Sequence, residues 1–258
     1  MCIRDRILAV QADEQAAHQL SEFLTANGCE VQVSLEAGLD DVGETSSLTV
    51  ALWSLQVRLS PRHLALTNAA ILADAAGNLA VGHLDDHPLP IGLSNLQSVD
   101  LRFDGMRKLR FGQLLSEFRK IERSRRHADT HEPLDQKIDV FVSHSENDLE
   151  IIEPLISDMR ETGATIWNED GAADNALQTI EASHLVCVMC SAHAYASDDV
   201  RRHLTIAKHL GTAILPVLLD GATMPEDIEF FLGALPALDM TGVELSGRAA
   251  ALRNAIAA

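Results

Sequence analysis

The chain has 258 residues, of which 47% are hydrophobic and 4% aromatic; this composition excludes a disordered protein and favours aliphatic α/β layers over a β-sandwich. The net charge of -18, from 20 Lys and Arg against 38 Asp and Glu, argues against nucleic acid or an anionic membrane as the main partner. We find neither a secretory leader nor an apolar span of about 18 residues, so we expect a cytoplasmic protein with no membrane segment.

The first half of the sequence, from residue 6 to residue 126, alternates predicted strands and helices. Short apolar runs rich in β-branched residues predict strands at 7–10, 29–33, 48–53, 79–84 and 99–101. Helices are predicted after Asp13, which we expect to cap the first of them, and at 60–76 and 105–126. In the last helix, the predicted apolar side includes Leu109, Leu114, Phe118 and Ile121.

The same alternation restarts after a predicted linker at 127–136, which contains a proline and lacks periodicity. Strands are predicted at 140–143, 165–167, 185–189, 214–219 and 237–240. An apolar helix face lies between 149 and 159, and further helices are predicted at 175–182, 197–210, 225–232 and 246–257. The second predicted domain therefore spans 137–258.

The two halves match each other at several positions. Gly28 and Gly163 are 135 residues apart, and Ser54 and Ser191 are 137 apart. Offsets that change by only a few residues indicate a duplicated unit with loop insertions. Because strands that alternate with helices form parallel sheets, each half is predicted to be a parallel sheet with helices on both faces.

Basic and acidic residues are unevenly distributed along the chain. Residues 1–126 hold 13 Lys and Arg against 16 Asp and Glu, a net charge of -3, whereas residues 127–258 hold 7 against 22, a net charge of -15. Eight of the first 13 basic residues lie between 107 and 126. This cluster is interpreted as the solvated face of a helix, or alternatively as a docking surface, which could bind the acidic second half.

The run at 139–148 reads Asp-Val-Phe-Val-Ser-His-Ser-Glu-Asn-Asp, a buried strand that ends in polar residues. With the strand end at 187–191 and the run Ile-Leu-Pro-Val-Leu-Leu-Asp at 214–220, it resembles the TIR (Toll/interleukin-1 receptor) domain family, bacterial type. Through Ala-Leu-Trp-Ser at 51–54 and Gly-Asn-Leu at 77–79, the first half resembles a diverged TIR domain. The resemblance implies two five-stranded parallel sheets in flavodoxin-like order, that is, tandem TIR domains.

Two kinds of function are implied by this resemblance. Many TIR domains are adaptors that assemble with other TIR domains, whereas some are similar to NAD glycohydrolases. The enzymes use one glutamate on the helix after the third strand, in a pattern close to Ser-x-Trp-Cys-x-x-Glu. A carboxylate suits this reaction because it stabilises the oxocarbenium character that develops when the nicotinamide–ribose bond breaks.

This sequence departs from the enzymatic pattern in both halves. In the stretch Ser-Asp-Asp-Val-Arg-Arg-His at 197–203, Asp199 takes the position of the Trp and His203 that of the Glu. By its spacing from the following glycine, Ala69 takes the Glu position in the first half. The loop after the second strand, which bears on cofactor access and assembly in the family, is also short in both halves. These departures predict catalytic degeneracy.

Several residues still qualify as site candidates. Asp199, or a loop carboxylate such as Glu169, could substitute for the missing glutamate, although both are simply explained as solvated caps and loop residues. His203 cannot supply a fixed negative charge and is more simply a hydrogen-bonding or ion-pairing partner on its helix face. If NAD binds as ligand or substrate, the resemblance implies contacts with residues at the strand ends and the helix start: Ser143, His144, Trp167, Ser191 and Ser197.

No metal site is expected from the cysteines or histidines. Cys187 and Cys190 have a metal-like spacing, but residues three apart in a strand point to opposite faces, so core packing is the better account. His83 and His87 lack the remaining ligands of a zinc site.

The sequence therefore favours a tandem of degenerate TIR domains that acts as a protein-interaction or scaffold module in bacterial signal transduction or defence, as part of a longer protein. The expected partners are other TIR domains or copies of the same chain. The alternatives are an NAD glycohydrolase and a nucleotide-sensing TIR domain without catalysis. No resident cofactor is expected.

Overall fold

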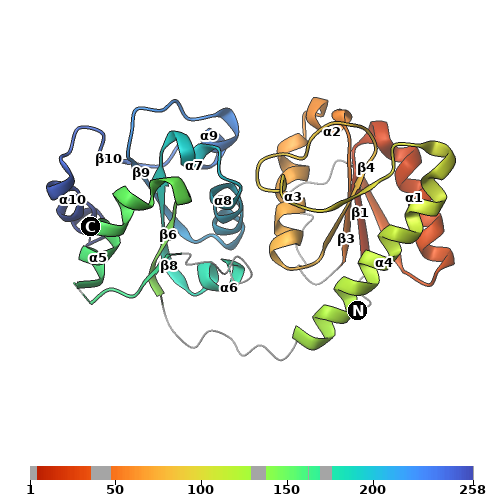
Figure 1. Cartoon of the computed structure of the whole chain (residues 1–258), viewed down its shortest axis with the longest axis horizontal. Coiled ribbons are helices and arrows are strands. Elements are labelled where there is room, and N and C mark those ends of the chain that lie inside the picture. Colours follow the sequence, from red (N-terminus) through yellow and green to blue (C-terminus); the bar gives the residue numbers. More distant parts are fainter. Residues whose placement is uncertain (1–4, 36–47, 129–137, 162, 169–175, 258) are drawn as a thin grey trace. The chain divides into compact units, whose positions relative to one another are not determined.

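The chain folds into two compact units, residues 1–131 and 132–258, in a computed structural model that describes residues 5–35, 48–128, 138–161, 163–168 and 176–257 (Figure 1). The division falls within the stretch predicted to be a linker. In these described parts of the chain, no helix has the length and apolar character needed to cross a membrane.

The first unit is a five-stranded parallel sheet in the order β2-β1-β3-β4-β5, with helices in the connections that follow its first and third strands. Its elements in chain order are β1 (Asp5–Ala9), the 3-10 helix η1 (Gln11–Asp13), α1 (Glu14–Ala26), β2 (Val31–Leu35), β3 (Thr49–Trp53), α2 (Leu55–Leu59), α3 (His63–Ala75), β4 (Leu79–His83), β5 (Ser98–Asp100) and α4 (Asp104–Ala128).

Helices cover both faces of this sheet because its central strand is apolar on both sides. Every residue of β3 is buried. Val50 and Leu52 pack in the core formed with α1 and α4, whereas Ala51, between them, packs with Ile71 of α3. Successive side chains of a strand point to opposite faces, so a continuous apolar run requires a helical layer on each side.

The second unit repeats this architecture, with the strand order β7-β6-β8-β9-β10. Its elements are β6 (Ile138–Ser143), η3 (Glu146–Asp148), α5 (Leu149–Glu161), β7 (Ile166–Asn168), α6 (Ala176–Glu181), β8 (Ser183–Cys190), α7 (Ala192–Tyr195), α8 (Asp198–Leu210), β9 (Ala213–Leu218), α9 (Glu226–Leu232), β10 (Leu238–Asp239) and α10 (Leu245–Ala257). Val140 and Val142 of β6 face the core with α5 and α10, whereas Phe141 packs against α8.

The predicted fold class is confirmed: both sheets are five-stranded, parallel and in flavodoxin-like order. Two short helices, α2 and α7, were not predicted, because four or five residues are too few to show a helical period. Both follow a serine at the end of the third strand of their unit. The loops that we predicted to be short after the second strands, at 36–47 and 169–175, and the predicted linker from 129 onward lie outside the described residues.

The predicted apolar side of the long helix was wrong at one position. Leu109 is 72% exposed, and Phe111 is buried with Leu114, Leu115 and Phe118 instead. At 100° per residue, Phe111 lies on the same side of α4 as Leu114 and Phe118, whereas Leu109 projects from the opposite side. The helix therefore presents an apolar side chain to solvent.

Candidate functional site

The carboxyl end of β6 and the facing side of α8 hold two of the predicted site residues in direct contact. Ser143, the last residue of β6, is buried, and its hydroxyl lies 3.0 Å from Nδ1 of His203. His203 is 3% exposed, and its ring packs edge-on against Phe141 with 4.9 Å between the ring centroids. The histidine that the resemblance matches to the family glutamate therefore lies in the packed core.

The other candidates of the second unit are dispersed around this contact. His144 is buried, and its Nδ1 lies 3.1 Å from the carbonyl oxygen of Ser145, while its Nε2 has no hydrogen-bond partner among the described residues. Trp167 is half-buried in β7. Glu169 lies outside the described part of the chain.

Ser197 and Asp199 serve the start of α8. The hydroxyl of Ser197 accepts a hydrogen bond from the amide of Val200 at 3.4 Å, which caps the helix. Asp199 is half-buried in the first turn, where a carboxylate is favoured by the helix dipole. In the first unit, Ala69, which the sequence comparison matched to the family glutamate, is fully buried in α3.

Ser191, Asp148 and Asp220 form a hydrogen-bonded group at the start of α7, which we call the bracket of the second unit. Its hydroxyl donates to Oδ2 of Asp148 at 2.5 Å and accepts from the amide of Ala194 at 2.9 Å. Oδ2 of Asp220 accepts from the amide of Ala192 at 3.0 Å. Two of the first amides of this short helix, which have no partner within it, are thus satisfied by side chains: the hydroxyl of Ser191, which caps the helix, and the carboxylate of Asp220.

The first unit contains the same bracket. The hydroxyl of Ser54 donates to Oδ2 of Asp13 at 2.5 Å and accepts from the amide of Gln56 at 3.1 Å. Oδ2 of Asp85 accepts from the amide of Leu55 at 2.6 Å. Asp13 occupies the cap position of α1, as predicted, but its side chain forms no cap bond there and accepts from Ser54 instead.

Both aspartates of the bracket were missed as functional positions, although the sequence contained a signal for them. Asp13 and Asp148 are 135 residues apart, as are Asp85 and Asp220. These offsets match the 137 residues between Ser54 and Ser191. Extending the comparison of the two halves to these aspartates would have found the bracket.

In the first unit, the bracket borders a cavity of about 680 Å³ at the carboxyl edge of the sheet. Asp13, Ser54 and Asp85 line one part of it, and Arg107 and Lys108 of α4 line another. Burial raises the pKa of Asp13, and the negative charge of Asp85 adds to this effect, while the hydrogen bond from Ser54 and the charge of Arg107 oppose it. The cavity is polar and carries both signs of charge, but both carboxylates already hold protein partners.

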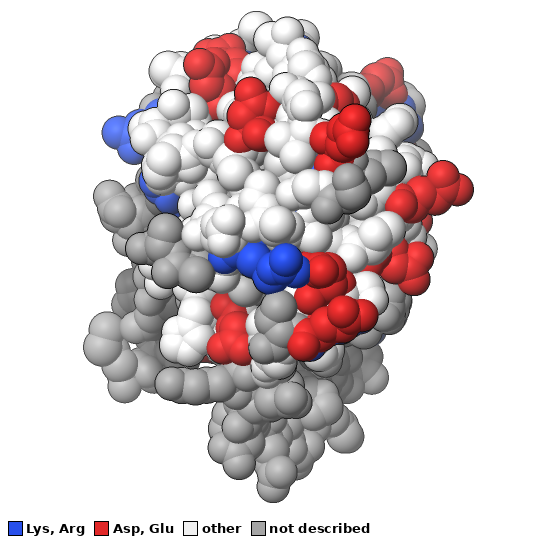
Figure 2. All heavy atoms as spheres, turned by 90° about the vertical axis from the view of Figure 1, so that its left-hand side faces the viewer, with Lys and Arg blue, Asp and Glu red and all other residues white. Residues whose placement is uncertain are grey.

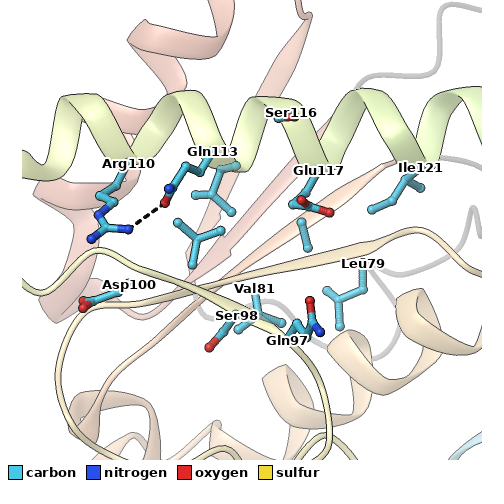
Figure 3. Close-up of a pocket in the computed structure, with 13 residues that line it drawn as sticks. Leu79, Val81, Gln97, Ser98, Asp100, Arg110, Gln113, Ser116, Glu117 and Ile121 are labelled. Atoms are coloured by element: carbon cyan, nitrogen blue, oxygen red, sulfur yellow. Dashed lines mark hydrogen bonds between the residues drawn. The ribbon is translucent and has the colours of Figure 1, made fainter.

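A second cavity, of about 500 Å³, lies between α4 and the sheet edge (Figure 3). Strand β5 pairs only with Val81, Gly82 and His83, so it leaves the beginning of β4 beside this cavity. Arg110 and Gln113 project into it from α4 and form a hydrogen bond of 3.0 Å. Its walls combine aliphatic and neutral polar side chains with a few charged ones, and no nucleophile is paired with a base there.

The two cysteines of β8 are core residues. Cys187 and Cys190 are buried, and burial raises the pKa of their thiols to about 12 and about 11. Because a thiolate is the form that ligates metals or attacks electrophiles, neither is suited to such chemistry. Among the described residues, no group of three or more His, Cys, Asp or Glu could hold a metal ion.

The two brackets predict unequal effects of the same substitution. Ser191→Ala is expected to destabilise the second unit by about 2.5 kcal/mol, because it removes the cap of α7 and the donor to the buried Asp148. Ser54→Ala is expected to cost only about 1 kcal/mol in the first unit, because Asp13 is half-buried and water can replace the donor.

Urea unfolding followed by tryptophan fluorescence measures both losses, since Trp167 reports on the second unit and Trp53 on the first. Equal losses would show that burial of the aspartate does not govern the cost.

Comparison with known proteins identifies the second unit. Residues 140–255 match the family described as TIR domain, so a TIR domain occupies this part of the chain. A similar solved structure is the TIR domain of the Toll-related receptor TRR-2 from the lower metazoan Hydra magnipapillata, at 20% identity over 47% of this chain and 97% of that chain, with a TM-score of 0.38.

A further structure is the GCN5-related glucosamine N-acetyltransferase region of a fungal multi-domain GH3 β-N-acetylglucosaminidase, at 15% identity over 80% of this chain and 29% of that chain, with a TM-score of 0.34. Scores this low carry no functional argument for either structure. No curated protein sequence matches the chain.

Proposed function

We propose that this protein is a protein-interaction and scaffold module whose TIR domain has lost the catalytic machinery of the NAD-cleaving members of its family. One observation carries the proposal: His203, at the position of the catalytic glutamate, is buried against Phe141 and bonded to Ser143. A group enclosed in this way neither reaches a substrate nor provides a fixed negative charge for an oxocarbenium ion.

Asp199 does not readily replace the missing carboxylate. It lies four residues before His203, one helical turn toward the start of α8, where its charge stabilises the helix end. The ends of β6 and β8 are also filled by their own side chains, since Ser143 and Ser191 are both buried and bonded to other side chains. A nucleotide at these strand ends would have to displace these contacts.

The first unit is proposed to be a diverged TIR-like copy that provides a second interaction module. Its strand order is the same as that of the TIR domain, and it has the same bracket of one serine and two aspartates. With Ala69 buried at the glutamate position, this copy is proposed to be non-catalytic as well. We place the protein in bacterial signalling or defence in the cytoplasm, with other TIR domains or its own copies as partners.

The NAD glycohydrolase and the nucleotide sensor remain the alternative functions. The observation that favours a ligand is the cavity of the first unit, where Arg107 and Lys108 could meet the phosphates of a dinucleotide. Under this alternative the protein binds NAD or a related nucleotide, with or without cleaving it.

Purified protein incubated with NAD is expected to release no nicotinamide above the rate of a heat-inactivated sample. The reaction is followed by chromatography, with and without crowding agents, because assembly activates some multi-subunit enzymes. Turnover that Asp199→Ala abolishes would overturn the scaffold proposal. Melting temperatures measured with NAD or ADP-ribose distinguish a nucleotide sensor from a scaffold that binds no nucleotide. A sensor is expected to melt at a higher temperature with its ligand, because the ligand binds the folded state.

A further inference from the structure

The cavity of about 680 Å³ in the first unit, which we call the carboxyl-edge cavity, lies beyond the ends of two neighbouring strands whose connections diverge. After β1 the chain passes through α1 to β2, and after β3 it passes to β4 on the other side of the sheet. Asp13 and Ser54 follow these two strands, and both line the cavity. In open parallel sheets this arrangement leaves a crevice beyond the strand ends, where ligands bind.

The carboxyl-edge cavity is separate from the position that was matched to the family glutamate. Its lining includes Gln15 and Gln19 of α1, one helical turn apart, and Arg107 and Lys108 of α4. Helices α1 and α4 cover one face of the sheet, whereas α3, which carries Ala69, covers the other (Figure 1). The loss of the glutamate therefore has no bearing on this cavity.

One wall of the cavity is negative. Oδ2 of Asp13 accepts from Ser54, whereas its Oδ1 accepts no hydrogen bond from another described residue. Asp85 accepts one hydrogen bond at each oxygen, from the amides of Leu55 and His87. Because an ionised carboxylate has about four acceptor positions, both aspartates can accept further donors. Burial raises the pKa of Asp13 and the charge of Asp85 adds to this effect, so a cation at this wall would stabilise both carboxylates.

The other wall is positive, and neutral amides lie between the two. Nε of Arg107 donates to the carbonyl oxygen of Leu101 at 3.1 Å, which ties this side chain to the end of β5. Lys108 is exposed, and its ammonium group forms no hydrogen bond or ion pair with another described residue. The amides that complete the lining can both donate and accept hydrogen bonds; they belong to Gln15, Gln19 and Gln56.

Comparison of the two units separates the residues that serve the fold from those that do not. Helix α4 begins at residue 104 and α10 at residue 245, so Arg107 and Arg248 are both the fourth residue of their helix. Both donate from Nε to a backbone carbonyl oxygen just before the helix. At the next position the second unit has Ala249 where the first has Lys108. The bracket and the arginine are therefore common to the fold, whereas the lysine is not needed for it.

From this arrangement we infer that the carboxyl-edge cavity binds a small zwitterion, a free amino acid or a dipeptide, with its ammonium group at the two aspartates and its carboxylate at Arg107 and Lys108. The volume of about 680 Å³ falls within the range of about 300–1,000 Å³ that is usual for ligand pockets. The glutamine amides are suited to a peptide group or a polar side chain. This inference goes beyond the scaffold proposal, because it makes the first unit a ligand sensor.

The charge of the whole chain also favours a ligand without net charge. The net charge is -18, and acidic side chains are prominent on the face of the second unit that Figure 2 shows. A field of this sign repels anions as they approach, whereas a zwitterion is not repelled. The positive wall therefore serves to orient one end of a zwitterion better than to capture a free anion.

Thermal unfolding of the full chain tests for the ligand. Trp53 reports on the first unit in a Trp167→Phe background, and Trp167 reports on the second unit in a Trp53→Phe background. The probes are the standard L-amino acids and dipeptides of glycine with polar residues, each at about 10 mM. At least one probe is expected to raise the melting temperature of the first unit by about 5 °C and to leave that of the second unit unchanged.

Titration calorimetry with the best probe tests the assignment of the two walls. The amine that lacks the carboxylate of this probe is expected to bind about tenfold more weakly, because it loses the charged hydrogen bonds to α4. Lys108→Ala is expected to weaken binding of the zwitterion about tenfold and to leave binding of the amine unchanged, which a merely structural role would not produce. Lys120→Ala is the matched control, since Lys120 is an exposed lysine about 18 Å further along the same helix.

Three results would overturn the inference. They are a panel in which no amino acid or dipeptide stabilises the first unit, binding that Lys108→Ala leaves intact, and stabilisation by NAD or ADP-ribose that Lys108→Ala abolishes. The third result would make the cavity a phosphate site and support the nucleotide sensor instead. Release of nicotinamide from NAD, in contrast, would contradict the scaffold proposal and leave a zwitterion bound in the first unit standing.

Discussion

His203→Glu, which restores the family residue, is expected to destabilise the TIR domain by about 3 kcal/mol at neutral pH and to create no NAD cleavage. The side chain at this position is 3% exposed and lies against Phe141 and Ser143. A carboxylate placed there loses its hydration and gains only one hydroxyl donor, so its pKa rises in the folded state. The loss of stability is then smaller at pH 5 than at pH 8, because the folded variant binds a proton that the unfolded chain releases as the pH rises.

Urea unfolding of the TIR domain measures this effect. Trp167 reports on the second unit in a Trp53→Phe background, which removes the signal of the other tryptophan. His203→Gln is the matched control, because it places an uncharged hydrogen-bonding group of similar length at the same position, and it is expected to cost about 1 kcal/mol. A stable His203→Glu variant that cleaves NAD would show that the site has room for a substrate, and the scaffold proposal would be wrong.

Asp227→Ala is expected to destabilise the TIR domain by about 3 kcal/mol, because it leaves the buried guanidinium of Arg201 without its counter-charge. Arg201, on α8, is 3% exposed and donates from Nη1 to the carbonyl oxygen of Asp227 at 2.7 Å and from Nη2 to its carboxylate. The guanidinium also lies over the ring of Phe231, 5.3 Å from its centroid. Burial lowers the pKa of Arg201 to about 10, as expected for a cation that has lost its contact with water.

The matched variant for this pair is Arg201→Met, which removes the buried charge and keeps an apolar side chain beside Phe231. It is expected to cost only about 1 kcal/mol, since both the ion pair and its desolvation disappear together. The same urea unfolding assay compares the two variants, and thermal melting supplies an independent order of stability. If Arg201→Met costs more than Asp227→Ala, the hydrogen bonds of Arg201 to α9 dominate the pair, not the cost of leaving a buried charge unpaired.

The two units were predictable from sequence because their signals are local. Apolar runs such as 48–53 and 185–189 report strands on their own, and their alternation with helices leaves few arrangements other than a parallel sheet. The landmarks Gly28 and Gly163 locate equivalent helix ends in both halves, since both glycines have positive φ angles there. The resemblance to the TIR family then supplied the strand order.

The candidate site was predictable only in part. The residues at the two positions matched to the family glutamate, His203 and Ala69, could be read from the sequence, and the loss of catalysis that they predict stays a prediction. The contact between Ser143 and His203 could not be predicted. These residues are 60 positions apart in the sequence, and their contact depends on the position of α8 along the sheet. The same holds for Asp148 and Ser191, which the pairing of β6 with β8 brings together.

By itself, then, the sequence determined two α/β units, the uneven division of charge between them and the identity of the residues matched to the family glutamate, because periodicity, composition and residue identity are properties of the chain alone. Only the tertiary structure decided that His203 is enclosed by Ser143 and Phe141, and that Leu109 faces solvent on a basic helix. The physical reason is that burial belongs to the packing of distant segments, which fixes the face that each helix turns toward its sheet.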